Sequence, residues 1–191
     1  MVSKGEIELI VDYALENESN LEIALKIAFA FNEIRKKIII DFLDALENAL
    51  RESLDNEWTI QNNLKKDVFA KWKGCYIAKK KWQDICLIGI ESDSSDAKNF
   101  FVTVRKNKEQ IPEAIGGGKL KNLLDKEYRP GSGGEQWIYW KYFEGIYRNW
   151  DEEVLIKMSF KKDEIVRYFK EQILRIKDIA TPVIDEAVKS M

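Results

Sequence analysis

The first part of the chain follows a helical pattern of apolar residues. Residues 5–16 repeat apolar side chains at helical spacing and predict a short amphipathic helix. After a break at residues 17–20, Ser19 and Glu22 have the spacing of a capping box, which satisfies two unpaired backbone N–H groups. A long helix is therefore expected from Ser19 to about Asp55. At about 1.5 Å per residue it would be about 50 Å long, so part of it should project, or pair with the C-terminal helix or a second copy of the chain.

From residue 72 the pattern changes to short runs of β-branched and aromatic residues, separated by polar stretches. Such runs predict strands, and the short connections favour an antiparallel meander. The expected strands are 72–79, 82–91, 99–106 and 137–143. If the first hairpin turns at Lys80 and Lys81, Cys75 faces Cys86. A reducing cytoplasm would favour two buried thiols over a disulfide there.

The last part of the chain is again helical. From Lys161 the apolar residues share one helical face, and Thr181 followed by Pro182 predicts a kink or a restart of the helix. Residues 109–128 form an interrupted helical pattern that contains glycines, and residues 130–134 form a loop. The expected fold class is α+β, with an antiparallel sheet of about four strands packed against long N-terminal and C-terminal helices.

Charge and aromatic residues are unevenly distributed over this predicted single domain (1–191). The formal net charge is −2, but the helical arm (1–57) sums to −7, the sheet region (58–150) to +6 and the C-terminal helices (151–191) to −1. The sheet region also holds all six tryptophans. A basic, aromatic region can mark a binding surface, although aromatic residues also fill sheet cores.

The chain contains no histidine and two cysteines. This composition excludes Ser-His-Asp and Cys-His nucleophile activation, His-based metal sites and a four-thiolate zinc site. Gly116–Lys119 lacks the pattern of a phosphate-binding loop, and no histidine could activate Ser132. Glu91, Asp93 and Asp96 could hold a divalent cation, but a polar turn is the simpler interpretation. We therefore expect no catalytic residue, no metal ligand and no cofactor.

Two groups of side chains in the sheet region are candidates for binding. One is a basic run interleaved with tryptophans, because ammonium groups contact phosphates and exposed rings stack on bases. The other is the aromatic segment 137–150, which could form either a core layer or a pocket for a planar ligand. A solvated hairpin tip with core tryptophans is the alternative interpretation of the basic run. The candidates are Lys79, Lys80, Lys81, Trp82, Arg105, Trp137, Tyr139, Trp140, Lys141, Tyr142, Arg148 and Trp150.

The order of the aromatic motifs resembles a known family over about residues 20–190. It looks like the C-terminal region of PD-(D/E)XK nuclease-family proteins of bacteria and phages. The nuclease core of that family would lie upstream, and none of its catalytic residues has a counterpart here. The resemblance implies a free-standing accessory domain. The motifs that carry it are Trp72-Lys-Gly-Cys-Tyr-Ile, Trp82 leading into 85–90, 100–105, Trp137-Ile-Tyr-Trp-Lys-Tyr and Tyr147-Arg-Asn-Trp150-Asp.

We expect a cytoplasmic, non-enzymatic binding protein whose partner is a protein or a nucleic acid rather than a small molecule or a membrane. The resemblance suggests a phage or mobile-element protein that interferes with a host defence system by binding. One alternative is a sponge or sensor for a nucleotide-like ligand, with the Gly117 or Gly133 loop as a lid. Another is a divalent-metal nuclease that uses Asp84, Glu91 or Asp93. A homo-oligomer could form through the long helix.

Overall fold

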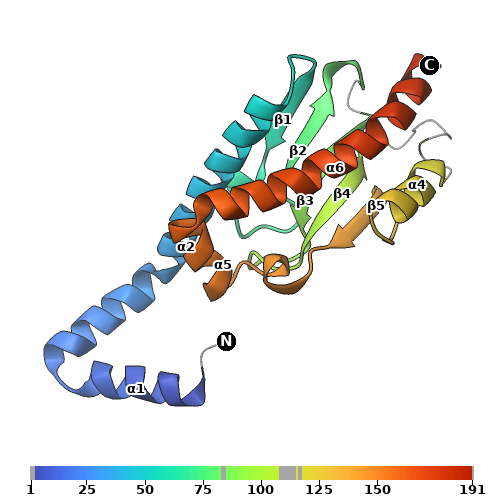
Figure 1. Ribbon diagram of the computed structural model, residues 1–191. Helices are drawn as coiled ribbons and strands as arrows, with labels where there is room; N and C mark the ends of the chain where they lie inside the picture. Colours follow the sequence, from blue (N-terminus) through green and yellow to red (C-terminus); the bar gives the residue numbers. More distant parts are fainter. Residues whose placement is uncertain (1–2, 83–84, 108–114, 116–117, 191) are drawn as a thin grey trace.

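The centre of the molecule is a five-stranded antiparallel sheet in the order β1-β2-β3-β4-β5 (Figure 1). The computed structural model describes residues 3–82, 85–107, 115 and 118–190. The predicted meander is confirmed, and β1 is an additional strand. Its five residues, shortly after a helix, form a period-2 pattern too short to be recognised in the sequence. The strands are β1 (Trp58–Asn62), β2 (Gly74–Lys79), β3 (Cys86–Ser92), β4 (Phe100–Lys106) and β5 (Trp137–Tyr142).

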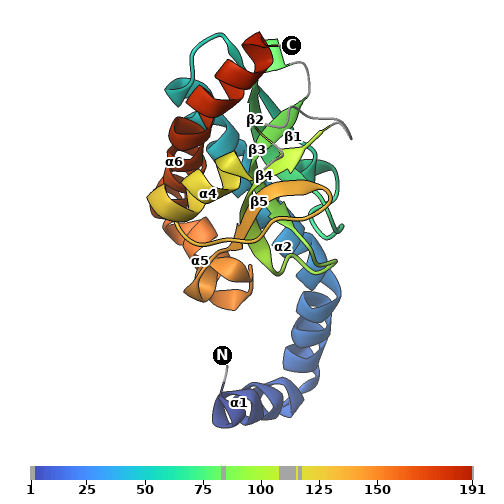
Figure 2. The same ribbon diagram turned by 90° about the vertical axis from the view of Figure 1, so that its right-hand side faces the viewer.

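Helices gather on one face of this sheet, as Figure 2 shows. The α+β class with long N-terminal and C-terminal helices is confirmed. The sequence assigns residues 151–191 to the C-terminal helices, but the helical pattern described there begins only at Lys161, so α5, which directly precedes α6, is not separately indicated. The helices are α1 (Lys4–Leu15), α2 (Glu18–Ser53), α4 (Lys119–Glu127), α5 (Glu152–Phe160) and α6 (Lys162–Lys189), with short 3-10 turns η1 (Leu64–Lys66), η2 (Lys80–Trp82) and η3 (Gly145–Arg148).

Aromatic rings join the sheet to its two long helices. Trp150 stacks on Phe100 of β4, with ring centroids 3.5 Å apart. The Trp150 ring also contacts Phe42 of α2 and Phe169 of α6 edge to face, with ring centroids 5.4 Å and 5.8 Å apart. All four residues are fully buried. Burial of rings this large is a major source of stability, so part of the tryptophan content belongs to the core.

The helix ends differ from the sequence prediction in detail. Asn17, not Ser19, caps α2, and its side chain accepts a hydrogen bond from the backbone N–H of Asn20 at 2.9 Å. The capping box lies instead at the start of α1, between Ser3 and Glu6. The prediction missed it because the apolar pattern of the first helix begins only at Ile7, four residues after Ser3.

Helix α6 continues through Thr181 and Pro182 without a restart. Proline cannot donate the usual backbone hydrogen bond. The Thr181 hydroxyl donates to the carbonyl of Lys177 at 2.6 Å. Ala180 and Ile184 are fully buried on either side of the proline. Packing against the sheet thus keeps the helix continuous where its local sequence favoured a break.

The register of the sheet keeps the two cysteines apart. Cys75 pairs with Ile90 and Cys86 pairs with Lys106, so the prediction that the cysteines face each other is wrong. The connection between β2 and β3 is longer than a two-residue turn, because Trp82 leaves the ladder and enters the core. Both cysteines are free thiols, and burial raises the pKa of each to about 12.

Candidate functional site

A small pocket lies on the sheet face opposite the helices. Along β4, Val102 and Val104 point into the helix-covered core, so the alternate residues point the other way. We call this site the aromatic pocket. It has a volume of about 100 Å³ and is lined by Trp72, Asp93, Phe101, Trp137, Trp140 and Tyr142.

The pairing of β4 with the edge strand β5 assembles most of the pocket. Phe101 pairs with Tyr142 across the ladder, and a register shift farther along brings Trp137 opposite Arg105. Phe101 is buried, and its ring lies 5.8 Å from Trp140 and 6.0 Å from Tyr142. Trp140 and Tyr142 are themselves 5.0 Å apart and nearly perpendicular. Two adjacent strands therefore supply a floor and two walls.

Trp72 closes the pocket from the loop before β2. Its ring lies 5.3 Å from that of Trp137, and its side chain is 45% exposed. Its φ of +60° is unusual for a residue with a side chain and costs about 1–3 kcal/mol. The backbone N–H of Trp72 donates to the carbonyl of Ser92 at 2.8 Å. The end of β3 thus holds this ring at the pocket mouth despite the backbone cost.

A buried carboxylate fixes Trp137. The indole Nε1 of Trp137 donates to Glu91 Oε2 at 3.3 Å, and Arg105 Nη1 donates to Glu91 Oε1 at 2.7 Å. Burial raises the pKa of Glu91, although Arg105, Trp137 and Tyr76 oppose that rise. Arg105, which the sequence suggested as a partner-binding residue, is thus half-buried and paired inside the protein.

Asp93 supplies the acidic group of the pocket. It follows β3 directly, and its Oδ2 accepts a short hydrogen bond from the Tyr142 hydroxyl. Burial, together with the hydrogen bond and charge of Asp93, raises the pKa of Tyr142 to about 12. Tyr142 is therefore a neutral donor at physiological pH, and its hydrogen bond holds the Asp93 side chain beside the rings.

A wider groove of about 540 Å³ lies along the other edge of β5, and it shares Trp140 and Tyr142 with the aromatic pocket. Its wall includes Lys141 and Arg148, both candidates from the sequence. The Arg148 guanidinium lies 4.1 Å from the centroid of the Tyr142 ring, and its Nε donates to Asn99 Oδ1 at 3.1 Å.

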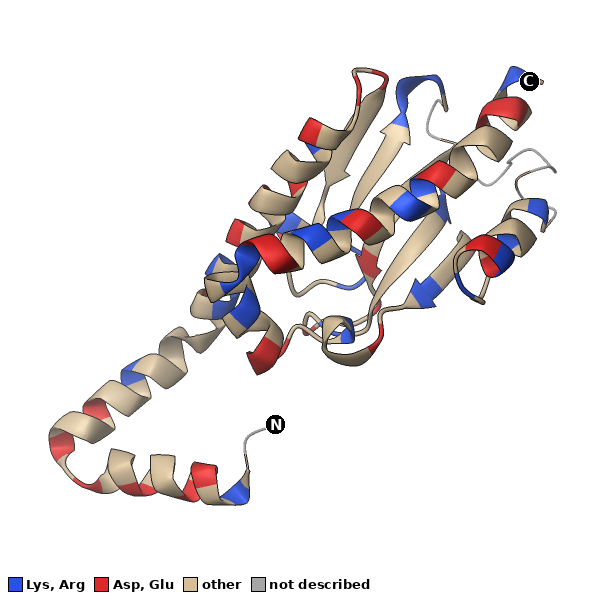
Figure 3. Cartoon of the chain, viewed as in Figure 1, with Lys and Arg blue, Asp and Glu red and all other residues tan. Residues whose placement is uncertain are grey.

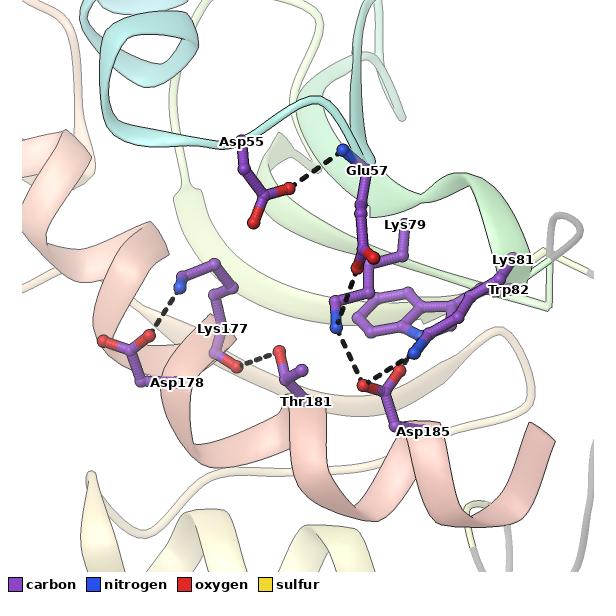
Figure 4. Close-up of polar contacts among 9 residues, drawn as sticks. All are labelled: Asp55, Glu57, Lys79, Lys81, Trp82, Lys177, Asp178, Thr181 and Asp185. Carbon is purple, nitrogen blue, oxygen red and sulfur yellow. Dashed lines mark hydrogen bonds and ion pairs between the residues drawn. The ribbon is translucent and has the colours of Figure 1, made fainter. Parts of the chain in front are cut away.

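The basic run does not form a free charged surface. Lys79 and Lys81 both pair with the Asp185 carboxylate of α6, at 2.8 Å and 3.1 Å, and Trp82 Nε1 donates to it at 2.7 Å (Figure 4). Burial disfavours the charge of Lys79, but Asp185 and Glu57 outweigh that effect and raise its pKa. Lys80 of this run remains exposed. Two of the three lysines at 79–81 are thus paired within the fold.

Three of the aromatic candidates lie in the core. Trp82, Tyr139 and Trp150 are fully buried, so they present no ring to a partner in this structure. The Tyr139 hydroxyl donates to the carbonyl of Arg129 at 2.9 Å. Trp150 Nε1 is buried without a hydrogen-bond partner among the residues described. Each ring lies on the helix-covered side, where the sequence pattern alone could not place it.

The acidic residues considered as metal ligands have separate partners. Glu91 pairs with Arg105, and Asp96 accepts a hydrogen bond from Arg35 of α2 at 2.9 Å. Within the described part of the chain, no group of three or more acidic or cysteine side chains could hold a metal ion. Asp84, like Gly116 and Gly117 of the glycine loop, lies outside the described residues.

Sequence reasoning missed three pocket residues as a set. Trp72 appeared as part of a motif and among the tryptophans of the basic run, Asp93 as a turn residue or a possible metal ligand, and Phe101 as part of a strand. Phe101 shares a face with the pocket rings by simple alternation along β4, and that signal was available. The position of Trp72 and Asp93 at the aromatic pocket depends on how the loop before β2 folds onto the end of β3, which no local pattern shows.

A second exposed feature is the projecting arm, which we define as residues 3–34 (Figure 1). Of the α1 residues that the structure describes, none is buried. The arm carries two bases and seven acids, and Figure 3 shows the acidic residues spread along both of its helices. No described helix has the length and hydropathy of a membrane span. The exposed apolar residues of the arm are Ile7, Leu9, Ile10, Val11, Tyr13, Leu15, Leu21, Ile23, Leu25, Ile27, Phe29, Phe31 and Ile34.

No family model matches the chain, and neither curated proteins nor solved structures include a significant match. The resemblance of the aromatic motifs to nuclease-family proteins therefore stays a prediction. Function has to be inferred from the geometry.

Proposed function

We propose that this protein is a non-enzymatic binding protein that holds part of its partner in the aromatic pocket. The observation that supports this most is the pocket itself, where aromatic side chains from a loop and two strands converge beside one carboxylate. Convergent rings with a few polar groups are typical of recognition sites. The half-exposed Trp72 adds to this, because its backbone conformation costs stability while much of its ring stays in water.

A protein partner is favoured over a nucleic acid. Phosphate recognition needs unpaired cations, whereas Lys79 and Lys81 share Asp185, and Arg105 is paired with Glu91. Asp93 would repel a phosphate brought into the pocket. The same reasoning disfavours a nucleotide-like ligand there. The wider groove beside Lys141 and Arg148 is the place where such a ligand would have to bind instead.

A nuclease role has less support. Hydrolysis by a divalent cation requires carboxylates that converge on the metal. Glu91 is engaged by Arg105 and Asp93 by Tyr142. Interference with a host defence system is compatible with a binding role, but that setting rests on the motif resemblance alone.

The binding role can be tested by comparing two variants of the purified protein. Trp72→Ala removes a pocket wall, whereas Phe160→Ala removes an 83% exposed ring from the end of α5. Each protein is immobilised and exposed to extract of the source cells, and retained proteins are identified and then tested in purified form. We expect a partner that loses at least about tenfold in affinity with Trp72→Ala, about 1.4 kcal/mol, and none with Phe160→Ala.

Separate assays distinguish the alternatives. Single-stranded and duplex oligonucleotides are tested for binding and, with Mg²⁺ or Mn²⁺, for cleavage. If nucleic acid is cleaved, or if every partner binds both variants equally, the proposed role of the pocket is wrong.

We also propose that the arm binds a second copy of the chain. Its two helices expose apolar side chains throughout, and α1 contributes nothing to the core among the residues described. Two such arms packed together would form a four-helix layer that covers both sets of apolar side chains. A second copy is the partner present wherever the chain itself is present.

A further inference from the structure

We propose that the group bound in the aromatic pocket is a methylated ammonium, carried either by a small molecule or by a lysine side chain of a protein. This inference rests on the proposed binding role of the pocket and names the chemistry that the pocket selects. It follows from four features: the electron-rich rings, the single carboxylate, the size of the cavity and the rigidity of its walls.

The rings create a site that attracts positive charge. The faces of tryptophan and tyrosine carry partial negative charge, and organic cations bind where several such rings converge. Trp72 and Trp137 lie 5.3 Å apart at an interplanar angle of 46°, and Trp140 and Tyr142 lie 5.0 Å apart at 72°. Two inclined ring pairs around one cavity can contact a compact, roughly spherical group from several sides.

The charge of the lining residues also favours a cationic ligand. Among the described residues that line the pocket, Asp93 is the one ionisable acid and no base is present. A cation would gain attraction from this carboxylate, and an anion would be repelled by it. A planar neutral ligand would gain no charge–charge attraction from Asp93, so the acid favours a cation over a ligand that only an apolar pocket would select.

The apolar walls favour a methylated cation over a plain ammonium. The ammonium group of lysine is compact and strongly hydrated, so removing its water is costly. Methyl groups replace N–H groups that water would otherwise solvate, while the positive charge remains. A cavity of about 100 Å³ suits one such group rather than a whole nucleotide.

The protein already places its own cations against these rings from outside the pocket. The Arg105 guanidinium lies 5.9 Å from the Trp137 centroid, and that of Arg148 lies 4.1 Å from the Tyr142 centroid. Neither arginine lines the cavity. The rings are therefore suited to cation contact while the space between them is left to a ligand.

The walls are held in place before any ligand arrives. Glu91 accepts a hydrogen bond from Trp137, Asp93 accepts one from Tyr142, and the carbonyl of Ser92 accepts one from the backbone of Trp72. A preorganised site loses little conformational freedom on binding, which raises affinity.

The test uses the full chain and four probes in isothermal titration calorimetry. The cationic probes are tetramethylammonium, choline and a short peptide with one trimethyllysine. The fourth is 3,3-dimethylbutan-1-ol, which has the shape of choline without its charge. We expect at least one cationic probe to bind at least about tenfold more tightly than the neutral alcohol. Preference for choline or for the peptide shows whether the natural group is carried by a small molecule or by a protein.

Two variants test the residues, and one serves as a control. Trp72→Ala should weaken the best cationic probe by about tenfold and Asp93→Asn by about fivefold, since each removes one attraction. Phe160→Ala, away from the pocket, should leave binding unchanged. Asparagine can still accept the hydrogen bond of Tyr142, so Asp93→Asn is expected to keep the fold, and thermal unfolding of each variant checks this.

Three results would overturn the proposal: no cationic probe that binds more tightly than the neutral alcohol, no binding of any cationic probe by the folded protein, or binding that Trp72→Ala leaves unchanged. If the neutral alcohol binds in a Trp72-dependent way at least as tightly as every cationic probe, the ligand class is wrong and the binding role of the pocket stands. The same conclusion follows if Trp72→Ala releases a partner while all cationic probes fail. If no probe binds and no partner depends on Trp72, the binding role of the pocket is rejected as well.

Discussion

At the residue scale, Asp185 shows how one side chain decides the role of several others. Its carboxylate, on α6, accepts hydrogen bonds from Lys79 and Trp82 and pairs with Lys81 (Figure 4). Burial alone would raise the pKa of Asp185, but its three partners outweigh burial and lower it. A basic run that looks like a binding surface in the sequence is therefore a contact between the sheet and the C-terminal helix.

Replacing Asp185 tests this contact. Asp185→Asn keeps the size of the side chain but removes the charge that two lysines share, so we expect the free energy of unfolding to fall by about 2 kcal/mol. Asp178→Asn is the matched control, because Asp178 is an exposed residue of the same helix that pairs with Lys177. It should change stability by less than about 0.5 kcal/mol. Urea unfolding at pH 7 measures both, and equal effects would contradict the assigned role.

The pH dependence of the same variant has a definite sign. Because the folded-state pKa of Asp185 lies below the ordinary value of 3.8, its stabilisation is fully present above that value. It is lost as the pH falls through the lowered pKa. The stability difference between the wild type and Asp185→Asn should therefore be largest near neutral pH and shrink below about pH 4. A difference that stays constant from pH 7 to pH 3 would show that the carboxylate charge is not responsible.

At the scale of elements, the close approach of β2 and β3 depends on a residue without a side chain. A Cβ atom on Gly89 would lie 2.1 Å from the carbonyl oxygen of Cys75 and 2.7 Å from the Cα of Tyr76. Both contacts are to backbone, which cannot turn away. These strands form the middle of the sheet, so their spacing also sets where Glu91 and Asp93 emerge beside the pocket.

Gly89→Ala should therefore destabilise the fold. We expect a loss of about 3 kcal/mol, near the upper end for overpacked sites. Gly134→Ala is the control, because its Cβ would meet Trp137 Cε3 at 3.6 Å, an ordinary contact. That change should stay within about 0.5 kcal/mol. Chemical denaturation measures the free energy of unfolding of both variants. If both lose equally little, the two strands can move apart to accept the Cβ atom and the prediction is wrong.

At the scale of the whole molecule, the arm and the sheet domain differ in how they bury apolar surface. The sheet and its helices enclose a continuous core, whereas the arm extends beyond it and leaves large side chains in water (Figure 1). Exposed apolar surface of this extent marks an interaction site. This contrast is the reason for proposing a second copy of the chain as the partner of the arm.

Light scattering after size exclusion tests the self-association. We expect the wild type to form dimers or larger species, and Phe29→Ser, which removes an 86% exposed ring, to raise the dissociation constant by about tenfold or more. Phe160→Ser should have no such effect. Because both arms are acidic, added salt should strengthen the association. A wild type that remains monomeric at all concentrations would rule the proposal out.

The sequence alone determined the long helices, most strands and the α+β class, because periodicity and turn residues act over a few neighbouring positions. It also restricted the chemistry through the missing histidine. Tertiary structure decided what those patterns serve. Asp185 neutralises lysines about a hundred positions earlier in the chain, and the sheet register places Trp137, Trp140 and Tyr142 in a pocket but Tyr139 in the core. Pairing and burial depend on contacts between distant segments, which no local pattern specifies.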